Sequence, residues 1–152
     1  MKIVFETPED GEDDRLIVRC RNLTPELYSL LKRFKSGNSV LAGSLRGKIY
    51  RVDSADVLYV KSYDGKTLIA TEEETYGSKI RLHELEKTLV EAGFVRISKS
   101  IIVNPEKVTS YSSARSGTLD AYLINSEKLT VSRKYSAAFR QSLGISNAAA
   151  TD

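Results

Sequence analysis

Residues that build enzyme active sites and metal centres are scarce in this chain of 152 residues. It has one cysteine, Cys20, and one histidine, His83, which excludes a disulfide within the chain and a metal site made of several thiolates or imidazoles. The patterns GxxxxGKS/T, GxGxxG and GxSxG are absent, so there is no phosphate loop, dinucleotide fingerprint or nucleophile elbow. We therefore expect a protein that is not an enzyme and binds no cofactor or metal.

Long apolar runs and an export signal are also missing. No run approaches the roughly 18 residues that span a bilayer, and the first residues, MKIVFETPED, hold one lysine, a very short apolar run and then acids. These features predict a cytoplasmic protein, in a compartment that keeps thiols reduced. Hydrophobic residues make up 41% of the chain and charged residues 28%, which is typical of a globular domain.

The isolated candidates for chemistry have ordinary structural explanations. Cys20 has no histidine near it in the sequence, so we expect a small buried or half-buried side chain and not a nucleophile. His83 lies in the helical stretch RLHELEK and is expected on the surface. The acids of residues 9–14 lie in a piece far shorter than an alternating α/β phosphoacceptor domain of roughly 100–150 residues, so they predict a solvated loop.

The N-terminal piece is expected to run strand, acidic turn, strand and helix. Residues 2–6 (KIVFE) and 15–21 (RLIVRCR) have the composition of short strands. A helix is expected to follow, with Thr24 as its N-cap and Pro25 at its first position. Apolar residues then recur at helical spacing and predict one buried stripe, made of Leu27, Leu30, Leu31 and Phe34.

From residue 38 onward strand patterns dominate. β-Branched and aromatic residues gather in short segments at residues 39–44, 47–52, 56–63, 66–72, 94–98, 100–104, 107–113, 118–124 and 128–132. Asp64-Gly65 is a hairpin signal. A helix is expected within residues 81–93, and a last one with Ser132 as N-cap and Phe139 buried. Because strands and helices do not alternate regularly, the chain predicts a mainly β (α+β) fold of antiparallel strands with about three short helices.

Charge is unevenly distributed along the strand-rich region. Residues 54–93 carry 5 Lys and Arg against 8 Asp and Glu, a net charge of −3, whereas residues 94–143 carry 8 against 3, a net charge of +5. A basic C-terminal third indicates an anionic partner such as nucleic acid. An unevenly charged solvated surface would have the same composition, so the position of each basic residue must be considered.

The basic residues lie where strands are expected to end. In RISKSIIVN, residues 96–104, a continuous strand would place Lys99 on an apolar face, where an unpaired ammonium is costly. The chain is therefore expected to turn at Ser98-Lys99 and to offer Lys99 to a phosphate or a base, unless it is an exposed lysine that guards an edge strand. Comparable positions are those of Lys66, Arg96, Arg115, Arg133 and Lys134. Cations on turns of a rigid β scaffold suit contact with a nucleic-acid backbone.

The order of these segments resembles that of a known family. DVLYV, LIAT, the segment from Phe94 to Asn104 (FVRISKSIIVN) and VSRKY at residues 131–135 follow one another as in the LytTR DNA-binding domain of bacterial transcription regulators. The resemblance covers about residues 44–143. It implies an elongated array of small antiparallel β-sheets whose loops, and not a recognition helix, enter successive major grooves.

The resemblance assigns roles to particular residues. The family's base-contacting loops fall at Lys66, Lys99 and Arg133. Family members often have His at the first position and Asn or His around Ser98 and Lys99, so lysines there keep the attraction for phosphate but depart from the pattern of base readout. Arg96 is either a DNA contact or a partner of a carboxylate or turn. The expected DNA-binding set is Lys66, Arg96, Ser98, Lys99, Arg115, Arg133 and Lys134.

Three segments and one function are expected. Residues 1–43 form a strand–helix extension that dimerises, regulates or packs locally; residues 44–143 form the LytTR-like domain; and residues 144–152 form a flexible tail. The resemblance implies a regulator without a receiver domain, which binds promoter repeats in double-stranded DNA as a homodimer and is controlled by a partner such as a small membrane protein. The alternative is a protein-interaction module that has lost DNA binding.

Overall fold

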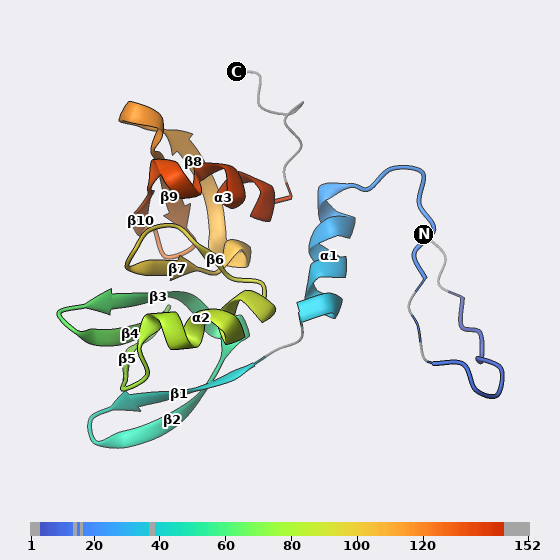
Figure 1. The fold of residues 1–152 in the computed structure, drawn as a ribbon, viewed down its shortest axis with the longest axis horizontal. Coiled ribbons are helices and arrows are strands. Elements are labelled where there is room, and N and C mark those ends of the chain that lie inside the picture. Colours follow the sequence, from blue (N-terminus) through green and yellow to red (C-terminus); the bar gives the residue numbers. More distant parts are fainter. Residues whose placement is uncertain (1–3, 14, 16, 37–38, 145–152) are drawn as a thin grey trace.

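The computed structural model of the chain describes residues 4–13, 15, 17–36 and 39–144 (Figure 1). Within them the fold is mostly β with three short helices, as the sequence predicts. The helices are α1 Pro25–Ser36, α2 Leu82–Glu91 and α3 Ser136–Ser142. The strands are β1 Val40–Leu45, β2 Lys48–Asp53, β3 Val57–Tyr63, β4 Lys66–Thr71, β5 Thr75–Ser78, β6 Val95–Arg96, β7 Ile101–Val103, β8 Val108–Ser113, β9 Leu119–Leu123 and β10 Lys128–Val131.

The strands form two antiparallel sheets. The larger has the order β2-β1-β5-β4-β3-β7-β6, and the smaller has the order β10-β9-β8. Helix α2 lies on one face of the larger sheet, where its Leu82, Leu85 and Leu89 join a core with side chains of β1 to β4 and β7. These leucines recur at helical spacing and are buried as expected. Gly93, with φ of 93°, ends the helical region.

The smaller sheet and α3 cover the other face of β3 and β7. Because neighbouring side chains of a strand point to opposite faces, Val60 of β3 belongs to the α2 core while Tyr59 packs against a second core. The register shifts between Val57 and Tyr59, so that Val57 also belongs to the α2 core and Leu58 to the second core. That second core also holds Phe139 of α3, which is fully buried as expected. The strands β3 and β7 thus lie between two apolar layers, and they fix the smaller sheet relative to the larger one.

The N-terminal piece differs from the prediction. Neither residues 4–6 nor the described part of residues 15–21 forms a strand, and Phe5 is 94% exposed. A short strand gains stability only from a partner strand and a covered face, and in the described residues these segments have neither. Cys20, expected to be buried or half-buried, is exposed for the same reason.

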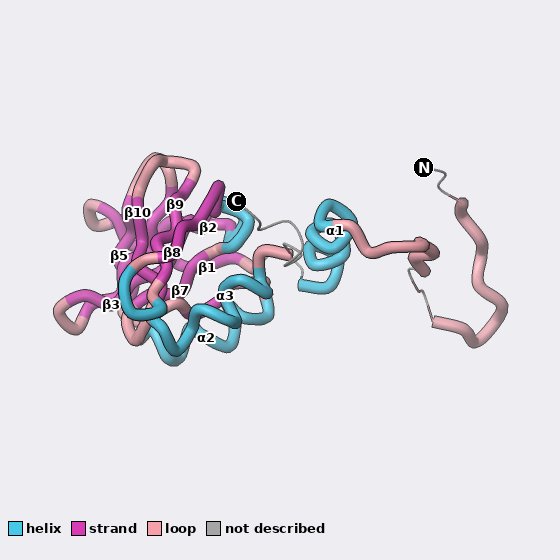
Figure 2. Tube along the Cα trace, turned by 90° about the horizontal axis from the view of Figure 1, so that it is seen from above, coloured by secondary structure: helices cyan, strands magenta, loops and turns pink. Residues whose placement is uncertain are grey.

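Helix α1 begins as predicted but does not bury its stripe. The backbone N–H of Leu27 donates to Thr24 Oγ1 over 3.2 Å, so Thr24 caps the helix and Pro25 takes its first position. Leu30 is 42% exposed, and the side chain of Phe34 lies outside the described residues. Figures 1 and 2 show α1 beside the strand-rich body, with the N-terminal residues extending beyond it.

Two details of the strand-rich region also correct the prediction. Strand β5 was not expected, because its residues TYGS follow three glutamates and lack an apolar run. Ser132 does not cap α3: its hydroxyl donates to the carbonyl of Ile97 over 3.2 Å, a 3₁₀ turn Arg133–Tyr135 follows, and the helix starts at Ser136. No described helix is long and apolar enough to cross a membrane.

Candidate nucleic-acid interface

The turns that carry the predicted cations meet at one end of the strands. The N–H of Ser62 in β3 donates to the carbonyl of Ser100 over 2.8 Å, which ties the β3–β4 hairpin to the β6–β7 loop. The N–H of Ser132 donates to the carbonyl of Ile97 over 2.8 Å, which ties that loop to the end of β10. These three chain segments are thereby held in one row, and Figure 1 shows them on the same side of the molecule.

Lys66 follows a tight two-residue turn between β3 and β4. Asp64 and Gly65 have φ of 50° and 72°, the left-handed values at both central positions that define a type I′ hairpin. Tyr63 and Lys66 pair across the turn, and both side chains are exposed. The short turn leaves the Lys66 ammonium projecting from a rigid hairpin end.

The β6–β7 loop turns where the sequence predicts. Val95 pairs with Val103 and Arg96 with Ile102, so the hairpin closes over Ser98, Lys99 and Ser100. Lys99 is exposed at the tip, whereas Ile97 just before it is fully buried. The alternation fails at Lys99 because the chain has left the strand there. Contact of this exposed lysine with DNA stays a prediction.

Arg96 supports this loop from behind. Its guanidinium forms a two-pronged ion pair with Glu86 of α2, at 3.0 Å from Nε to Oε1 and 2.9 Å from Nη2 to Oε2. Its Nη1 donates to the carbonyls of Ser98 and Lys99 over 3.2 and 2.7 Å. The hydrogen bonds from Arg96 hold the pKa of the Glu86 carboxyl below its usual value. Arg96 therefore has both of the structural roles expected for it: it pairs with a carboxylate and it stabilises the turn.

Arg133 lies over the neighbouring turn of the smaller sheet. A tight turn, Arg115–Gly117, joins β8 to β9, with Ser116 in the left-handed region at a φ of 60°. The hydroxyl of Ser136 donates to the carbonyl of Gly117 over 2.9 Å. A Cβ added to Gly117 would lie 3.2 Å from Cγ of Arg133, so the arginine stem packs across this glycine. The Arg133 residue is exposed, which leaves its forked donor group accessible. Arg115 and Arg133 are thus brought to one corner of the row.

The remaining predicted site residues differ in accessibility. Lys134 is exposed, and its ammonium lies 5.4 Å from the centre of the Tyr135 ring, a cation–π contact that directs the side chain. Ser98 is half-buried, and its hydroxyl accepts a hydrogen bond from the N–H of Ser100 over 3.2 Å. Ser98 therefore shapes the loop, whereas Lys134 extends the charged row.

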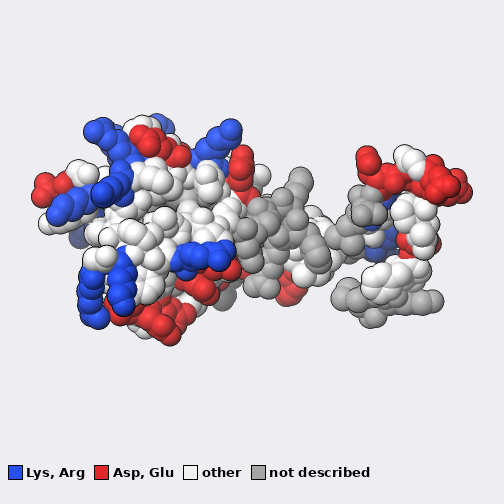
Figure 3. Space-filling view, turned by 90° about the horizontal axis from the view of Figure 1, so that it is seen from below, with Lys and Arg blue, Asp and Glu red and all other residues white. Residues whose placement is uncertain are grey.

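The same end carries further cations that the sequence reasoning missed. Arg46 and Lys48 are exposed at the β1–β2 turn, and Lys79 and Arg81 are exposed between β5 and α2. Figure 3 shows Lys and Arg side chains along the left end of the strand-rich body, the end at which these turns lie. The sequence held a signal for the first of these turns. A glycine followed by a lysine occurs at the predicted β3–β4 turn, in DGK at residues 64–66, and again in RGK at residues 46–48.

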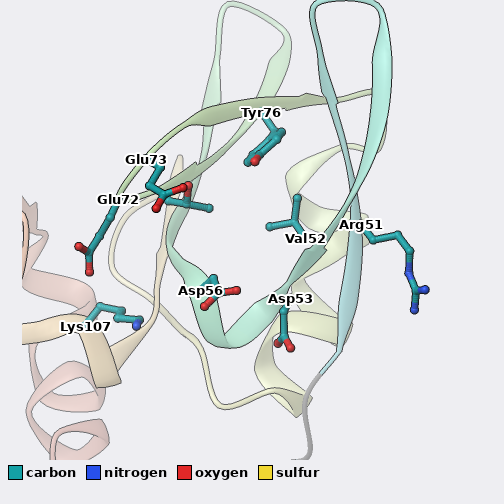
Figure 4. A pocket seen from close by; sticks show the side chains of 9 residues that line it. Arg51, Val52, Asp53, Asp56, Glu72, Glu73, Tyr76 and Lys107 are labelled. Atoms are coloured by element: carbon teal, nitrogen blue, oxygen red, sulfur yellow. The ribbon is translucent and has the colours of Figure 1, made fainter.

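The opposite end of the strands is acidic. A cavity of about 410 Å³ opens there, with carboxylates on its walls (Figure 4). Its lining includes Asp53, Asp56, Glu72, Glu73 and Lys107. The described residues include no group of three or more side chains suited to hold a metal ion. The molecule is thus polarised, and an anion is favoured at the end that carries the turns.

Comparison with known proteins agrees with this geometry. The LytTr DNA-binding domain model matches residues 47–144. The chain is 32% identical over 105 residues to the sensory transduction protein LytT of Bacillus anthracis, covering 69% of this chain and 43% of that protein. It is 30% identical to an uncharacterized HTH-type transcriptional regulator of Staphylococcus aureus, covering 69% of this chain and 71% of that protein. The chain spans less than half the length of the LytT protein.

A solved structure gives the same result. The LytTr DNA-binding domain of a Bacillus cereus protein, described as a methyl-accepting/DNA response regulator, superimposes with a TM-score of 0.66 at 30% identity. The match covers 72% of this chain and all of that domain. The family model covers well over half of the chain, and the fold agrees with it. The chain therefore belongs to the LytTR DNA-binding domain family.

Proposed function

We propose that this protein is a sequence-specific DNA-binding regulator of transcription. The observation that carries the proposal is the row of exposed cations on turns that hydrogen bonds hold at one end of the fold. Each turn belongs to a rigid hairpin or a strand end, so its charge is already positioned before DNA arrives. Membership of a DNA-binding family supports the same function.

The residues of the row divide into two kinds of contact. Lys66 and Lys99 are point charges that attract backbone phosphates, and each phosphate contact makes the affinity more sensitive to salt. Arg133 presents a planar fork, which can donate two hydrogen bonds to O6 and N7 of guanine in the major groove. We assign sequence preference mainly to Arg133, and a positioning role to Arg96, whose donors Glu86 and two carbonyls already occupy.

Assembly and control form the second part of the proposal. The protein acts in the cytoplasm, where promoter DNA is present, and binds promoter repeats as a homodimer with residues 1–43 in assembly or regulation. The exposed apolar side chains of that segment, among them Phe5 and Leu23, support a partner-binding role. A small membrane protein is one candidate for the partner that supplies the signal, in keeping with relatives named sensory transduction proteins.

Binding to DNA from upstream of the protein's own gene, measured across a salt series, tests the function. The wild type should prefer this DNA to an unrelated duplex, with affinity that falls steeply as salt rises. Arg133→Ala should reduce the preference by 1–3 kcal/mol, or roughly 5- to 150-fold. Arg51→Ala removes the same charge from an exposed residue at the acidic end and should retain the preference. Weak binding of the wild type to every duplex would instead favour a protein-interaction module.

A further inference from the structure

Two hairpins of the larger sheet end in the same kind of turn. In the β1–β2 turn, Arg46 and Gly47 have φ of 49° and 79°, close to the values of Asp64 and Gly65 in the β3–β4 turn. In each case a lysine follows at once, Lys48 in the first turn and Lys66 in the second. The β1–β2 turn carries one more positive charge, because arginine takes the position that aspartate holds in the other.

The two turns lie on the same side of the molecule (Figures 1 and 4). Strand β2 begins after the β1–β2 turn and ends at Asp53, and strand β4 begins after the β3–β4 turn and ends at Thr71. Asp53 and Thr71 line the same acidic cavity. Both turns are therefore at the ends of their hairpins that lie away from this cavity.

The β1–β2 hairpin is fixed to the sheet by tight packing. A Cβ added to Gly43 would lie 2.7 Å from Cβ of Tyr76 in β5, so the strands approach closely there. The rings of Tyr50 and Tyr76 lie 5.6 Å apart, and Leu41 and Val52 are buried in the α2 core. The turn is held by the same core that holds the β3–β4 hairpin.

The charges of this turn have no assigned role within the described structure. Arg46 and Lys48 are exposed, and neither forms an ion pair with another described residue. In this they resemble Lys66 and differ from Arg96, whose guanidinium is fully engaged. The carboxylates that could neutralise charge on β2, such as Asp53, lie at the far end of the strand.

We propose that the Arg46–Lys48 turn is a further phosphate-binding point, which contacts the DNA backbone beside the segment that Lys66 contacts. The inference rests on the proposed function and extends it: the protein's footprint is longer than the family's base-contacting loops require. The contact is to phosphate and not to bases, because Lys48 is a point charge and Arg46 is not held by packing. Arg46 is exposed and a Cβ added to the adjacent Gly47 would meet no atom within 4 Å, whereas the stem of Arg133 packs across Gly117.

A charge-matched pair of double variants tests this proposal. Arg46→Asn with Lys48→Gln removes two charges from the turn, and asparagine tolerates the left-handed backbone at position 46. Arg51→Gln with Lys128→Gln removes two charges from the acidic end: Arg51 lines the cavity, and Lys128 follows the β9–β10 turn, whose Ile124 hydrogen-bonds to Lys107. Binding of each intact variant to the upstream DNA is measured over a salt series, together with hydroxyl-radical footprinting.

The turn variant should lower the slope of log affinity against log salt by about 2 and shorten the footprint at one end, with unchanged sequence preference. The control should keep the wild-type slope and footprint.

Provided that the wild type binds its site, an unchanged slope and footprint in the turn variant, or an equal loss in the control, overturns the inference. Absence of site-preferring binding by the wild type overturns the proposed function, and the inference with it. Lys48→Gln alone, with an expected slope change of about 1, replaces the double variant if circular dichroism shows that the latter is unfolded.

Discussion

At the scale of single residues, the same amino-acid type serves two different purposes in this domain. Arg133 and Arg96 both lie near strand ends, and both are part of the family-like pattern in the sequence. The structure separates them: Arg133 is exposed, whereas only 16% of the Arg96 side chain is exposed and its donors are occupied. The sequence could identify the cations and their turns. It could not tell a free guanidinium from an engaged one, because the partner Glu86 comes from a helix ten residues earlier.

Replacement of Arg96 by alanine should destabilise the fold. It removes the ion pair to Glu86 and two hydrogen bonds to loop carbonyls, so we expect the free energy of unfolding to fall by about 2 kcal/mol. Arg96→Lys should recover little of this loss, because an ammonium lacks the fork that reaches the carboxylate and both carbonyls. Urea denaturation measures the effect, with Arg51→Ala as a control that should leave stability nearly unchanged.

The loop should lose order in the same variant. Hydrogen exchange at the amides of Ser98 to Ser100 should accelerate in Arg96→Ala relative to exchange in α3, since the brace is local. Wild-type stability together with wild-type exchange in the loop would contradict the positioning role, and Arg96 would then return to the set of direct DNA contacts.

At the scale of elements, prediction from sequence succeeded where a pattern was dense and local. The strands from β1 to β4 and the leucine stripe of α2 follow directly from alternation and helical spacing. Strand β5 was missed because its stability comes from neighbours: β1 and β4 pair with its two edges, although its own residues are mostly polar or small. Residues 4–6 have the reverse property, a strand-like composition without a described partner. In both cases, pairing with a neighbouring strand determines whether the segment forms a strand, and composition does not.

Tight turns are the elements that position the cations, and Gly65 should be essential to one of them. Its φ of 72° is left-handed, and an added Cβ would meet no atom within 4 Å, so Gly65→Ala introduces backbone strain without a steric clash. We expect the free energy of unfolding to fall by about 1–2 kcal/mol and DNA affinity to fall with it as Lys66 is displaced. Thermal denaturation and a binding titration measure the two effects.

Gly77→Ala is the matched control. Gly77 lies in β5 without a left-handed φ, and its added Cβ would lie 3.7 Å from the carbonyl oxygen of Ser44, an ordinary contact. This variant should be as stable as the wild type. Equal losses in both variants would show that any methyl group added to the sheet destabilises it, and that the left-handed backbone of Gly65 is not the cause.

At the scale of the whole molecule, the polarity of the domain emerges only from the strand order. The basic turns are distributed from residue 46 to residue 134, and they meet because antiparallel strands return to the same end at every second turn. The acidic cavity is formed in the same way by the alternate connections. A reader of the sequence can find each charge but cannot derive the order β2-β1-β5-β4-β3-β7-β6, since it depends on long-range pairing.

The junction between the two sheets includes a hydrogen bond whose strength depends on pH. The hydroxyl of Tyr59 in β3 donates to Oε2 of Glu127, which precedes β10, over 2.8 Å. Burial, followed by the hydrogen bond and the negative charge of Glu127, raises the pKa of Tyr59 from 10.0 to about 12. The folded protein therefore holds the phenolic proton more tightly than the unfolded chain does.

This difference predicts a loss of stability in alkaline solution. A group with a raised pKa in the folded state contributes its full stabilisation below the unfolded pKa of 10.0, and loses it as the pH rises toward about 12. Urea denaturation of the wild type and of Tyr59→Phe between pH 8 and about 11.5 isolates the effect, because the two proteins have every other ionisable group in common. The stability advantage of the wild type should be constant up to about pH 9 and then shrink. An advantage that stays constant to the highest pH would mean that Tyr59 ionises with its ordinary pKa, and that the hydrogen bond to Glu127 does not join the sheets in solution.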